Sequence, residues 1–530
     1  MATEFDADVI VVGSGACGSN LANELAVKGK SVILLEAGAN VPRWKILENF
    51  RNSGRHYDRN NAYPNNPWSP TSNTPGYIDN VGEFREQPGM LKLVGGTTWH
   101  WGGATWRYIP NDFKLKTMYG VGRDWPISYS DLEPFYTRAE YAIGVAGSDT
   151  EDQSGQNPGI SFPPRSKAYP VDPEADIYSN AKLKAALLPH GHSVVHEPTV
   201  RIHRPYDGRP GCQGNNNCDQ VCPIGTLYNG SVHADKAVRN GAKLITDAVV
   251  HKITKGEQGK ITSVSYLTPA GEEHTLTAKY FVLAAHSFET SKLMLMNDIG
   301  NSSDMVGRNL MDHIGLSMNF LADEPMWAGR GPVQQATIMT WRDGDFRSKY
   351  SANKHSLANN NPQIDIAQRA INEGLMGKEL DARILDWSSR WMSIYSFLEP
   401  LPNPANRVQP NPSWKDSLGL PGIKVTFDVD DYTKLGAKHM IEQYKQIAGL
   451  MNGQIIDLNT EFENHDHLMG TMIMGDNPKD SVVNHECRSH DHPNLFIASV
   501  GVIPAAGVVN PTLTGVALAI RSADIIAKEV

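Results

Sequence analysis

Cysteine is scarce in this chain, with five residues in 530. So few cysteines exclude a disulfide-rich fold, which needs a framework of paired thiols. Long apolar runs are absent as well, since no stretch approaches the roughly 20 residues that span a bilayer. Basic residues do not outnumber acidic ones either. The formal net charge is -9, which argues against a nucleic-acid surface.

The first residues lack the features of a signal peptide. Met1–Asp8 is acidic and leads straight into a predicted strand. A secretory signal needs a basic region, an apolar stretch and a cleavage site, so we expect none on this chain. The remaining composition, with 20% charged residues and 47 glycines, is typical of a soluble globular protein. A chain of this length is expected to form two domains.

Three of the five cysteines lie in one short stretch, as Cys212, Cys218 and Cys222. Clustered thiolates followed by Pro223 favour a metal or iron–sulfur site. A structural zinc site completed by His203 is one alternative, although zinc usually takes short-spaced ligand pairs. Free thiols are another. Cys17 and Cys487 lie far from this cluster in sequence, and we expect both to be buried and reduced.

The N-terminal segment predicts a βαβ unit. Val9–Val12 is a β-branched run of the kind found in buried parallel strands. Ser19–Lys28 is the predicted helix, and Ser31–Leu35 is the second strand. This arrangement is typical of a dinucleotide-binding fold.

The turn of this unit carries a glycine fingerprint. Gly13 permits a tight turn, Gly15 lets the backbone approach a pyrophosphate, and Gly18 allows close helix packing. Glu36 ends the second strand, where an acid hydrogen-bonds ribose hydroxyls. The sequence therefore predicts a dinucleotide site, without separating FAD from NAD.

The rest of the chain divides into regular and irregular stretches. Residues 42–88 and 148–173 are rich in polar residues, proline and glycine, and we expect irregular structure there. Strands are predicted at residues 243–246, 248–253, 261–267, 279–284, 423–429 and 495–499. Helices are predicted at residues 433–451 and at the C-terminus.

Four further blocks point to a known family. Gly95–Trp101, Val282–Thr290, Val306–His313 and Asn510–Thr514 resemble, in the same order, motifs of the glucose–methanol–choline (GMC) oxidoreductases. The resemblance implies an α/β fold with a Rossmann-like FAD-binding domain assembled from discontinuous segments. It also implies a substrate domain with an antiparallel sheet flanked by helices.

The implied domain division follows the order of these blocks. Residues 1–110, 195–315 and 455–530 would form the FAD-binding domain, with an iron–sulfur segment at residues 203–225. Residues 111–194 and 316–454 would form the substrate domain and its connections.

One branch of the family is similar in more detail. Arg107–Phe113, Tyr119–Trp125, Arg204–Arg209 and the cysteine stretch resemble catalytic subunits of bacterial membrane-associated sugar, polyol and sugar-acid dehydrogenases. The resemblance implies two partners, a small chaperone-like subunit with a twin-arginine signal and a multihaem cytochrome c. It implies export with the first partner to the periplasmic face of the inner membrane.

The resemblance also assigns the redox centres. A [3Fe–4S] cluster would be held by Cys212, Cys218 and Cys222, and Gln213 stands where some relatives have a fourth cysteine. Such a cluster would let a two-electron flavin discharge stepwise to a one-electron haem. FAD would contact a larger set of residues, namely Gly13, Gly15, Gly18, Glu36, Gly95, Gly96, Thr98, His100, Val250, Ala285, Pro511 and Thr512.

His100 raises the question of how FAD is attached. Some relatives bind FAD covalently through a histidine at this loop position, and others bind it non-covalently, so both remain open. Trp99, Trp101 and Trp106 either shape the entrance or pack the loop.

Alcohol oxidation needs a base for the hydroxyl proton and delivery of hydride to the flavin. Alignment on Gly470 and Ile473–Gly475 selects His467 as the base, with His465 as the close alternative and Asn510 as a hydrogen-bonding partner of the substrate oxygen. His485, His490 and His492 are predicted to be structural, and Glu399 is a weaker candidate for sugar contact.

These assignments predict an acceptor-linked dehydrogenase. Sorbitol is the first expected substrate, followed closely by glucose, gluconate and fructose. An oxidase that uses O2 is one alternative, opposed by the cysteine stretch. A nucleotide-binding scaffold with structural zinc is another, opposed by His467 and Asn510 in their motifs.

Overall fold

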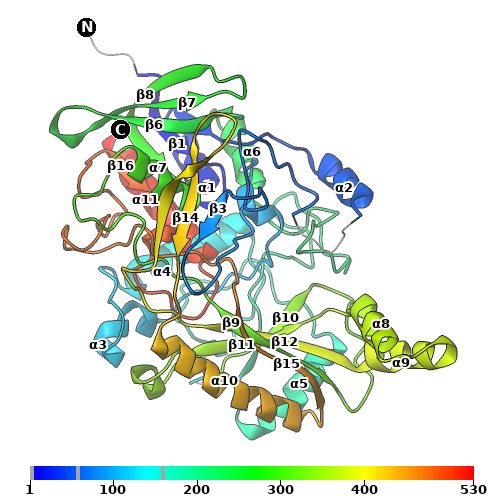
Figure 1. The fold of residues 1–530 in the computed structure, drawn as a ribbon. Helices are drawn as coiled ribbons and strands as arrows, with labels where there is room; N and C mark the ends of the chain where they lie inside the picture. Colours follow the sequence, from blue (N-terminus) through cyan, green and yellow to red (C-terminus); the bar gives the residue numbers. More distant parts are fainter. Residues whose placement is uncertain (1–4, 55–59, 157–160) are drawn as a thin grey trace.

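The structure is a computed structural model that describes residues 5–54, 60–156 and 161–530. Its secondary structure gathers into one mainly parallel sheet, one antiparallel sheet and a small third sheet (Figure 1).

The first sheet has seven strands in the order β5-β2-β1-β8-β7-β6, with β16 paired to β8. The parallel strands are β1 (Ala7–Val12), β2 (Val32–Leu35), β5 (Lys243–Ile245), β8 (Glu273–Leu283) and β16 (Leu495–Ile497). The strands β6 (Val249–Lys255) and β7 (Ile261–Leu267) extend it in antiparallel pairing. Both faces of β1 are buried, which explains its uninterrupted apolar sequence.

Helices pack on this sheet. Val9 and Val11 contribute to the core beneath α1 (Ala16–Val27) and α11 (Thr512–Glu529), and α6 (Ser231–Arg239) packs beside α1. Ile10 and Val12 belong to a larger core on the opposite side.

The second sheet is antiparallel throughout, in the order β15-β9-β12-β11-β10-β4. Its strands are β4 (Val194–His196), β9 (Gly315–Leu321), β10 (Gln334–Ile338), β11 (Asn353–Ala358), β12 (Trp391–Leu398) and β15 (Gln454–Glu463). The helix α10 (Asp431–Leu450) lies along one face of this sheet (Figure 1). Asp430 caps it by accepting a hydrogen bond from the Thr433 N–H at 2.7 Å.

The third sheet joins β13 (Arg407–Lys415), β14 (Pro421–Thr426) and β3 (Ile78–Asn80). The other α-helices are α2 (Arg43–Asn52), α3 (Leu115–Tyr119), α4 (Tyr129–Ile143), α5 (Tyr178–Leu187), α7 (Ser287–Met296), α8 (Gln363–Asn372) and α9 (Gly377–Arg390).

The predicted βαβ unit, the later strands and the helix at residues 433–451 are confirmed within about three residues at each end, except that β8 begins at Glu273, six residues before its predicted start. The prediction of irregular structure over residues 42–88 is wrong at α2 and at the short strand β3. That helix is held by Ile46, which is fully buried in a small apolar cluster, and by Arg43, which lies over the Trp99 ring. The predicted division into domains remains a prediction.

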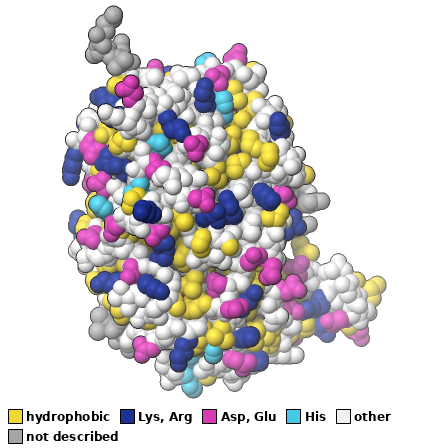
Figure 2. All heavy atoms as spheres, turned by 60° about the vertical axis from the view of Figure 1, so that its left-hand side comes forward, with side chains coloured by type: hydrophobic (Ala, Val, Ile, Leu, Met, Phe, Trp, Pro, Cys, Tyr) yellow, Lys and Arg dark blue, Asp and Glu magenta, His cyan; other side chains and the backbone are white. Residues whose placement is uncertain are grey.

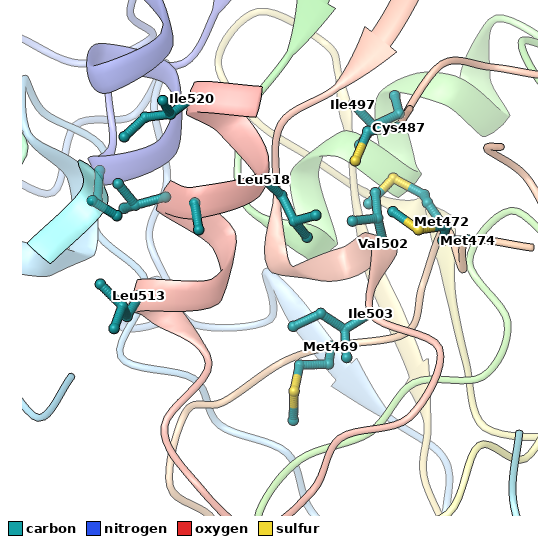
Figure 3. Packing of buried hydrophobic residues seen from close by; sticks show 14 of the residues in the cluster. Met469, Met472, Met474, Cys487, Ile497, Val502, Ile503, Leu513, Leu518 and Ile520 are labelled. Atoms are coloured by element: carbon teal, nitrogen blue, oxygen red, sulfur yellow. The ribbon is translucent and has the colours of Figure 1, made fainter. Parts of the chain in front are cut away.

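Cys487 is buried as predicted, among the methionines that follow the His465–His467 segment (Figure 3). Burial raises the pKa of this thiol to about 11, so it stays protonated. Cys17, the second residue of α1, is a free thiol as predicted, and burial raises its pKa to about 12, although it lines a cavity and keeps partial exposure. On the face of the molecule seen in Figure 2, acidic and basic side chains are interspersed, which agrees with the absence of a basic surface there.

Candidate active site

One cavity of about 310 Å³ runs between the nucleotide loop and the segment that carries His467. Most of the predicted cofactor and catalytic residues line it, namely Gly13, Gly15, Glu36, Gly96, Thr98, His100, Val250, Ala285, His467, Asn510, Pro511 and Thr512. Trp101 lines it too, and so does His465. These residues come from segments far apart in sequence, so the fold brings the predicted site together.

The glycine loop has the geometry that its sequence predicts. Gly13 has a φ of +104°, and a Cβ there would lie 2.5 Å from the Ala284 oxygen. A Cβ at Gly18 would lie 2.0 Å from the Gly13 oxygen, so this glycine serves packing and does not line the cavity. A Cβ at Gly15 would meet nothing within 4 Å, which leaves the backbone open to a ligand.

Glu36 lies at the end of β2 and faces the loop. Its carboxylate accepts hydrogen bonds from the Ser14 hydroxyl at 2.6 Å, the Ser14 N–H at 3.1 Å and the Gly38 N–H at 3.0 Å. Burial raises the pKa of Glu36, and these hydrogen bonds act in the opposite direction. The carboxylate therefore supports the loop and also lines the cavity.

The second glycine pair supports the loop from the other side. Gly96 has a φ of +58°, and a Cβ there would lie 3.2 Å from the Gly15 Cα. Gly95 lies outside the cavity lining, because it packs against the Ser231 backbone and the Trp99 ring. The Thr98 hydroxyl donates to the Gly95 oxygen at 2.7 Å and holds this turn closed.

Two histidines and an asparagine form a connected row at the far end of the cavity. The Nδ1 atoms of His313 and His467 lie 3.1 Å apart. His467 Nε2 lies 2.9 Å from Asn510 Nδ2, and His313 Nε2 lies 3.0 Å from the Gly507 oxygen. His313 is fully buried, whereas His467 and Asn510 retain exposure inside the cavity.

The hydrogen-bond partners assign the tautomers. Burial lowers the pKa of His313 to about 3, so its ring is neutral and carries one N–H. The Gly507 carbonyl can only accept, which places this proton on His313 Nε2 and leaves Nδ1 as an acceptor. His467 Nδ1–H therefore donates to His313, and His467 Nε2 keeps its lone pair. The Asn510 amide donates to that lone pair.

Burial also lowers the pKa of His467 well below 6.5. A positive charge on the neighbouring His313, His465 or Lys354 would oppose protonation of His467 further. His467 is therefore neutral at ordinary pH, and its Nε2 atom can accept a proton.

Asp312 holds the backbone of the histidine segment. Its carboxylate accepts the N–H groups of His465, Asp466 and His467, at 3.1, 3.2 and 2.7 Å. Burial, with a contribution from Asp466, raises the pKa of Asp312 to about 7. Asp312 thus holds the backbone of His467 in place, and the neighbouring His313 holds the orientation of the His467 ring.

His465 and His467 differ in their surroundings. His465 packs on Phe397, with ring centroids 4.4 Å apart, and His467 lies 5.0 Å from the same ring. Of the two, His467 is the one hydrogen-bonded to Asn510 and His313. Both line the cavity, so either remains a possible base.

His100 lies at the cavity wall with its Nε2 atom 2.7 Å from the Gly89 oxygen. In the neutral ring this contact places the proton on Nε2 and leaves Nδ1 as the nucleophilic nitrogen. Its ring also lies 5.5 Å from that of Tyr63. Covalent attachment of FAD through His100 remains a prediction.

The three clustered cysteines are surrounded by backbone donors and cations. The Gly214 N–H points to Cys212 Sγ and the Leu227 N–H to Cys222 Sγ, both at 3.4 Å. Burial raises the pKa of Cys218 to about 11, while Arg201 and the Val333 N–H oppose this rise. Within residues 5–54, 60–156 and 161–530, no three His, Cys, Asp or Glu side chains converge closely enough to hold a metal ion.

Two other sequence-based candidates have structural partners. His203 lies 3.4 Å from Asp172, which gives it an ionic partner outside the cysteine stretch. Glu399 is fully buried against Arg347 and accepts a hydrogen bond from Tyr432 at 3.1 Å. The expectation that Glu399 contacts a sugar is therefore wrong, because its carboxylate is occupied by this ion pair.

The other histidines near the C-terminus behave as expected for structural residues. His492 Nδ1 lies 2.6 Å from the Gly259 oxygen, and its Nε2 accepts the Gly300 N–H at 3.0 Å. His490 contacts the Ser481 hydroxyl at 2.9 Å. No functional role was predicted for His313, Asp312 or Lys354. The block Val306–His313 was the one available signal for the first two.

A parallel sheet with a glycine-rich turn, joined to an antiparallel sheet with a neutral histidine pair beside it, is the arrangement of a dinucleotide-dependent oxidoreductase. Residues 210–315 and 402–519 match the sequence profiles described as GMC oxidoreductase. The chain is 42% identical to the fructose dehydrogenase large subunit of Gluconobacter japonicus, over 98% of both chains. The chain belongs to the GMC oxidoreductase family and is an FAD-dependent oxidoreductase.

A more distant relative lies on the same branch. The gluconate 2-dehydrogenase flavoprotein of Pantoea cypripedii is 24% identical, over 98% of this chain and 94% of its own. Among solved structures, a formate oxidase variant of Aspergillus oryzae has a TM-score of 0.66 at 16% identity and covers 99% of both chains. This last likeness concerns the fold alone. Among the described residues, no helix is long and apolar enough to cross a membrane.

Proposed function

We propose that this chain is the catalytic subunit of an acceptor-linked dehydrogenase that oxidises a polyol or sugar. The observation that carries the proposal is the neutral His467, whose Nε2 lone pair faces the cavity beside the Asn510 amide. The fructose dehydrogenase relative supports a sugar substrate. Sorbitol is the substrate expected from sequence, and the name of this relative supports fructose as a second candidate.

In this proposal His467 Nε2 accepts the proton of the substrate hydroxyl. The Asn510 amide N–H, which otherwise donates to this lone pair at 2.9 Å, would turn to the substrate oxygen and orient the reacting carbon. Transfer of that proton creates an imidazolium at His467, and the His313 Nδ1 atom stabilises it by accepting its Nδ1–H. When bound against the Gly13–Gly18 loop, FAD would supply the two-electron acceptor.

The electron acceptor is proposed to be reached through the cysteine stretch. Cys212, Cys218 and Cys222 would hold a [3Fe–4S] cluster, which when bound would supply a one-electron centre. Backbone N–H groups that point at Cys212 Sγ and Cys222 Sγ support this proposal, as does Arg201, which opposes the rise in the pKa of Cys218 that burial causes. Among the described residues the three thiols do not converge on a position for a single metal ion, so the proposal concerns a cluster of several irons.

The proposed partners follow from the branch of the family. They are a multihaem cytochrome c and a small chaperone-like subunit with a twin-arginine signal, which would carry the chain to the periplasmic face of the inner membrane. The relative's name as a large subunit supports an assembly of several chains.

The test is anaerobic mixing of the FAD-loaded protein with fructose, sorbitol, glucose and gluconate, followed at the flavin absorbance. Bleaching by at least one of them is expected, with reoxidation by ferricyanide or cytochrome c much faster than by O2. Fast reoxidation by O2 would instead identify an oxidase. No bleaching by any of the four would contradict the proposal.

A further inference from the structure

The two faces of the antiparallel sheet differ sharply in polarity. The face under α10 is apolar and closely packed, with Met318, Phe320, Ile394 and Met440 in one core. The opposite face looks toward His465 and His467, because Phe397 on β12 contacts both rings. A buried sheet face is normally apolar, and burying polar side chains costs free energy, so polar residues on this inner face indicate a functional role.

A row of hydroxyl groups crosses the inner face. Ser317 on β9 pairs with Tyr395 on β12, and Tyr395 pairs with Ser356 on β11. Thr337 on β10 continues the row, since it pairs with Ser356 and its hydroxyl lies 3.5 Å from that of Ser356. Four neighbouring strands thus place a hydroxyl-bearing residue at the same level.

The row lies next to the reaction site. Tyr395 and Phe397 are two residues apart on one strand and therefore share a face. The Tyr395 ring centroid lies 6.0 Å from that of His465. Tyr395 and Ser317 also keep partial exposure although they lie on interior strands, which indicates open space on this face.

A buried lysine completes the polar face. Lys354 is 1% exposed, and its Nζ atom lies 4.2 Å from the Phe397 ring centroid. Within the described residues it makes one hydrogen bond, to the Ser356 hydroxyl at 3.4 Å. Burial lowers the pKa of Lys354 to about 7, and even the neutral amine has two donors, so at least one of them makes no hydrogen bond in this part of the chain.

We propose that Ser317 and Tyr395, with the buried Ser356 and Lys354 behind them, form a subsite that binds the hydroxyl groups of the substrate beyond its reacting carbon. Adjacent strands lie about 4.8 Å apart, so neighbouring members of the row can contact different hydroxyls of one sugar. This inference rests on the proposed function and assigns its specificity to the sheet.

Binding is measured by calorimetry in the His467→Ala background, where turnover is blocked, with the substrate that reduces the wild-type flavin. Tyr395→Phe and Ser317→Ala should each weaken binding by about 3- to 10-fold, the usual worth of one hydrogen bond. Tyr350→Phe is the matched control, because this phenol stacks on His439 away from the inner face. It should leave binding unchanged.

Monodeoxy analogues of the same substrate separate recognition from structure. Wild-type protein should bind the analogue that lacks the hydroxyl contacted by Tyr395 more weakly than it binds the substrate. In Tyr395→Phe this difference should disappear for that analogue and persist for the other analogues. Equal losses for every analogue, or unchanged binding in both variants, would overturn the subsite. If no sugar or polyol reduces the wild-type flavin, the proposed function itself fails.

Discussion

The Nδ1 atoms of His313 and His467 face each other at 3.1 Å, although the two residues are 154 positions apart in the chain. Because His313 Nε2 is occupied by the Gly507 carbonyl, this contact leaves His467 with its Nε2 lone pair toward the cavity. The account of catalysis depends on this relationship, and it makes His313 a positioning residue.

Replacing His313 should therefore slow catalysis without loss of bound FAD or substrate affinity. In His313→Phe, the His467 ring loses the acceptor that fixes its tautomer. We expect the limiting rate of flavin reduction to fall by about 10²-fold, within the range that general base catalysis contributes. Substrate affinity and FAD content should change little. A rate equal to that of wild type would show that His313 has no positioning role.

The pH dependence follows from the lowered pKa of His467. A lowered pKa means that the neutral, proton-accepting ring persists as pH falls below the ordinary histidine value of 6.5. The rate of flavin reduction should thus stay constant from pH 8 to below pH 6.5 and decline only at lower pH. Stopped-flow measurements across this range check it. Because the pKa of Asp312 is itself about 7, an inflection at or above pH 6.5 contradicts the burial argument if the Asp312→Asn variant shows it too.

Acid stability should depend on the buried neutral histidines. His355 contacts the Ser396 hydroxyl and the Gln443 amide, and burial lowers its pKa to about 3. The unfolded chain binds a proton near pH 6.5 and the folded chain does not. Stability is therefore complete above pH 6.5, and each unit below it costs up to about 1.4 kcal/mol until the folded pKa is reached.

Urea midpoints at pH 7 and pH 5 test this dependence. The loss between the two values should be smaller in His355→Gln than in wild type. His485→Gln is the control, because that side chain is half-exposed, and it should leave the loss unchanged. Equal losses in all three proteins would contradict the assignment to His355.

The cysteine stretch makes a chemical prediction. Purified protein should contain about three irons per flavin with acid-labile sulfide, and its oxidised form should give the EPR signal of a [3Fe–4S] centre. Cys218→Ser should keep flavin reduction by substrate and lose electron transfer to cytochrome c. Zinc without iron, or normal cytochrome reduction by the variant, would contradict electron transfer through a [3Fe–4S] cluster.

Local patterns in the sequence predicted much of the fold. The βαβ unit, the glycine loop and α10 follow from periodicity and turn residues that lie next to one another in the chain. The helix α2 escaped prediction, because its packing on Trp99 depends on a distant segment.

The site was predictable only where motifs carried it. His467 and Asn510 lie in recognisable blocks, but their contact with His313 arises from three strands and loops meeting in space. The hydroxyl row is invisible in sequence, since Ser317, Ser356 and Tyr395 become neighbours only through the register of β9, β11 and β12. Glu399 was misassigned for the same reason, because Arg347 reaches it from a separate element.

The most direct test of the central claim compares wild type with His467→Ala in anaerobic flavin reduction. Both proteins are loaded with FAD and mixed with the best of fructose, sorbitol, glucose and gluconate. The account predicts bleaching in wild type and a rate at least about 10²-fold lower in the variant, with FAD still bound. Equal rates in the two proteins would contradict it, because His467 would then not be the base.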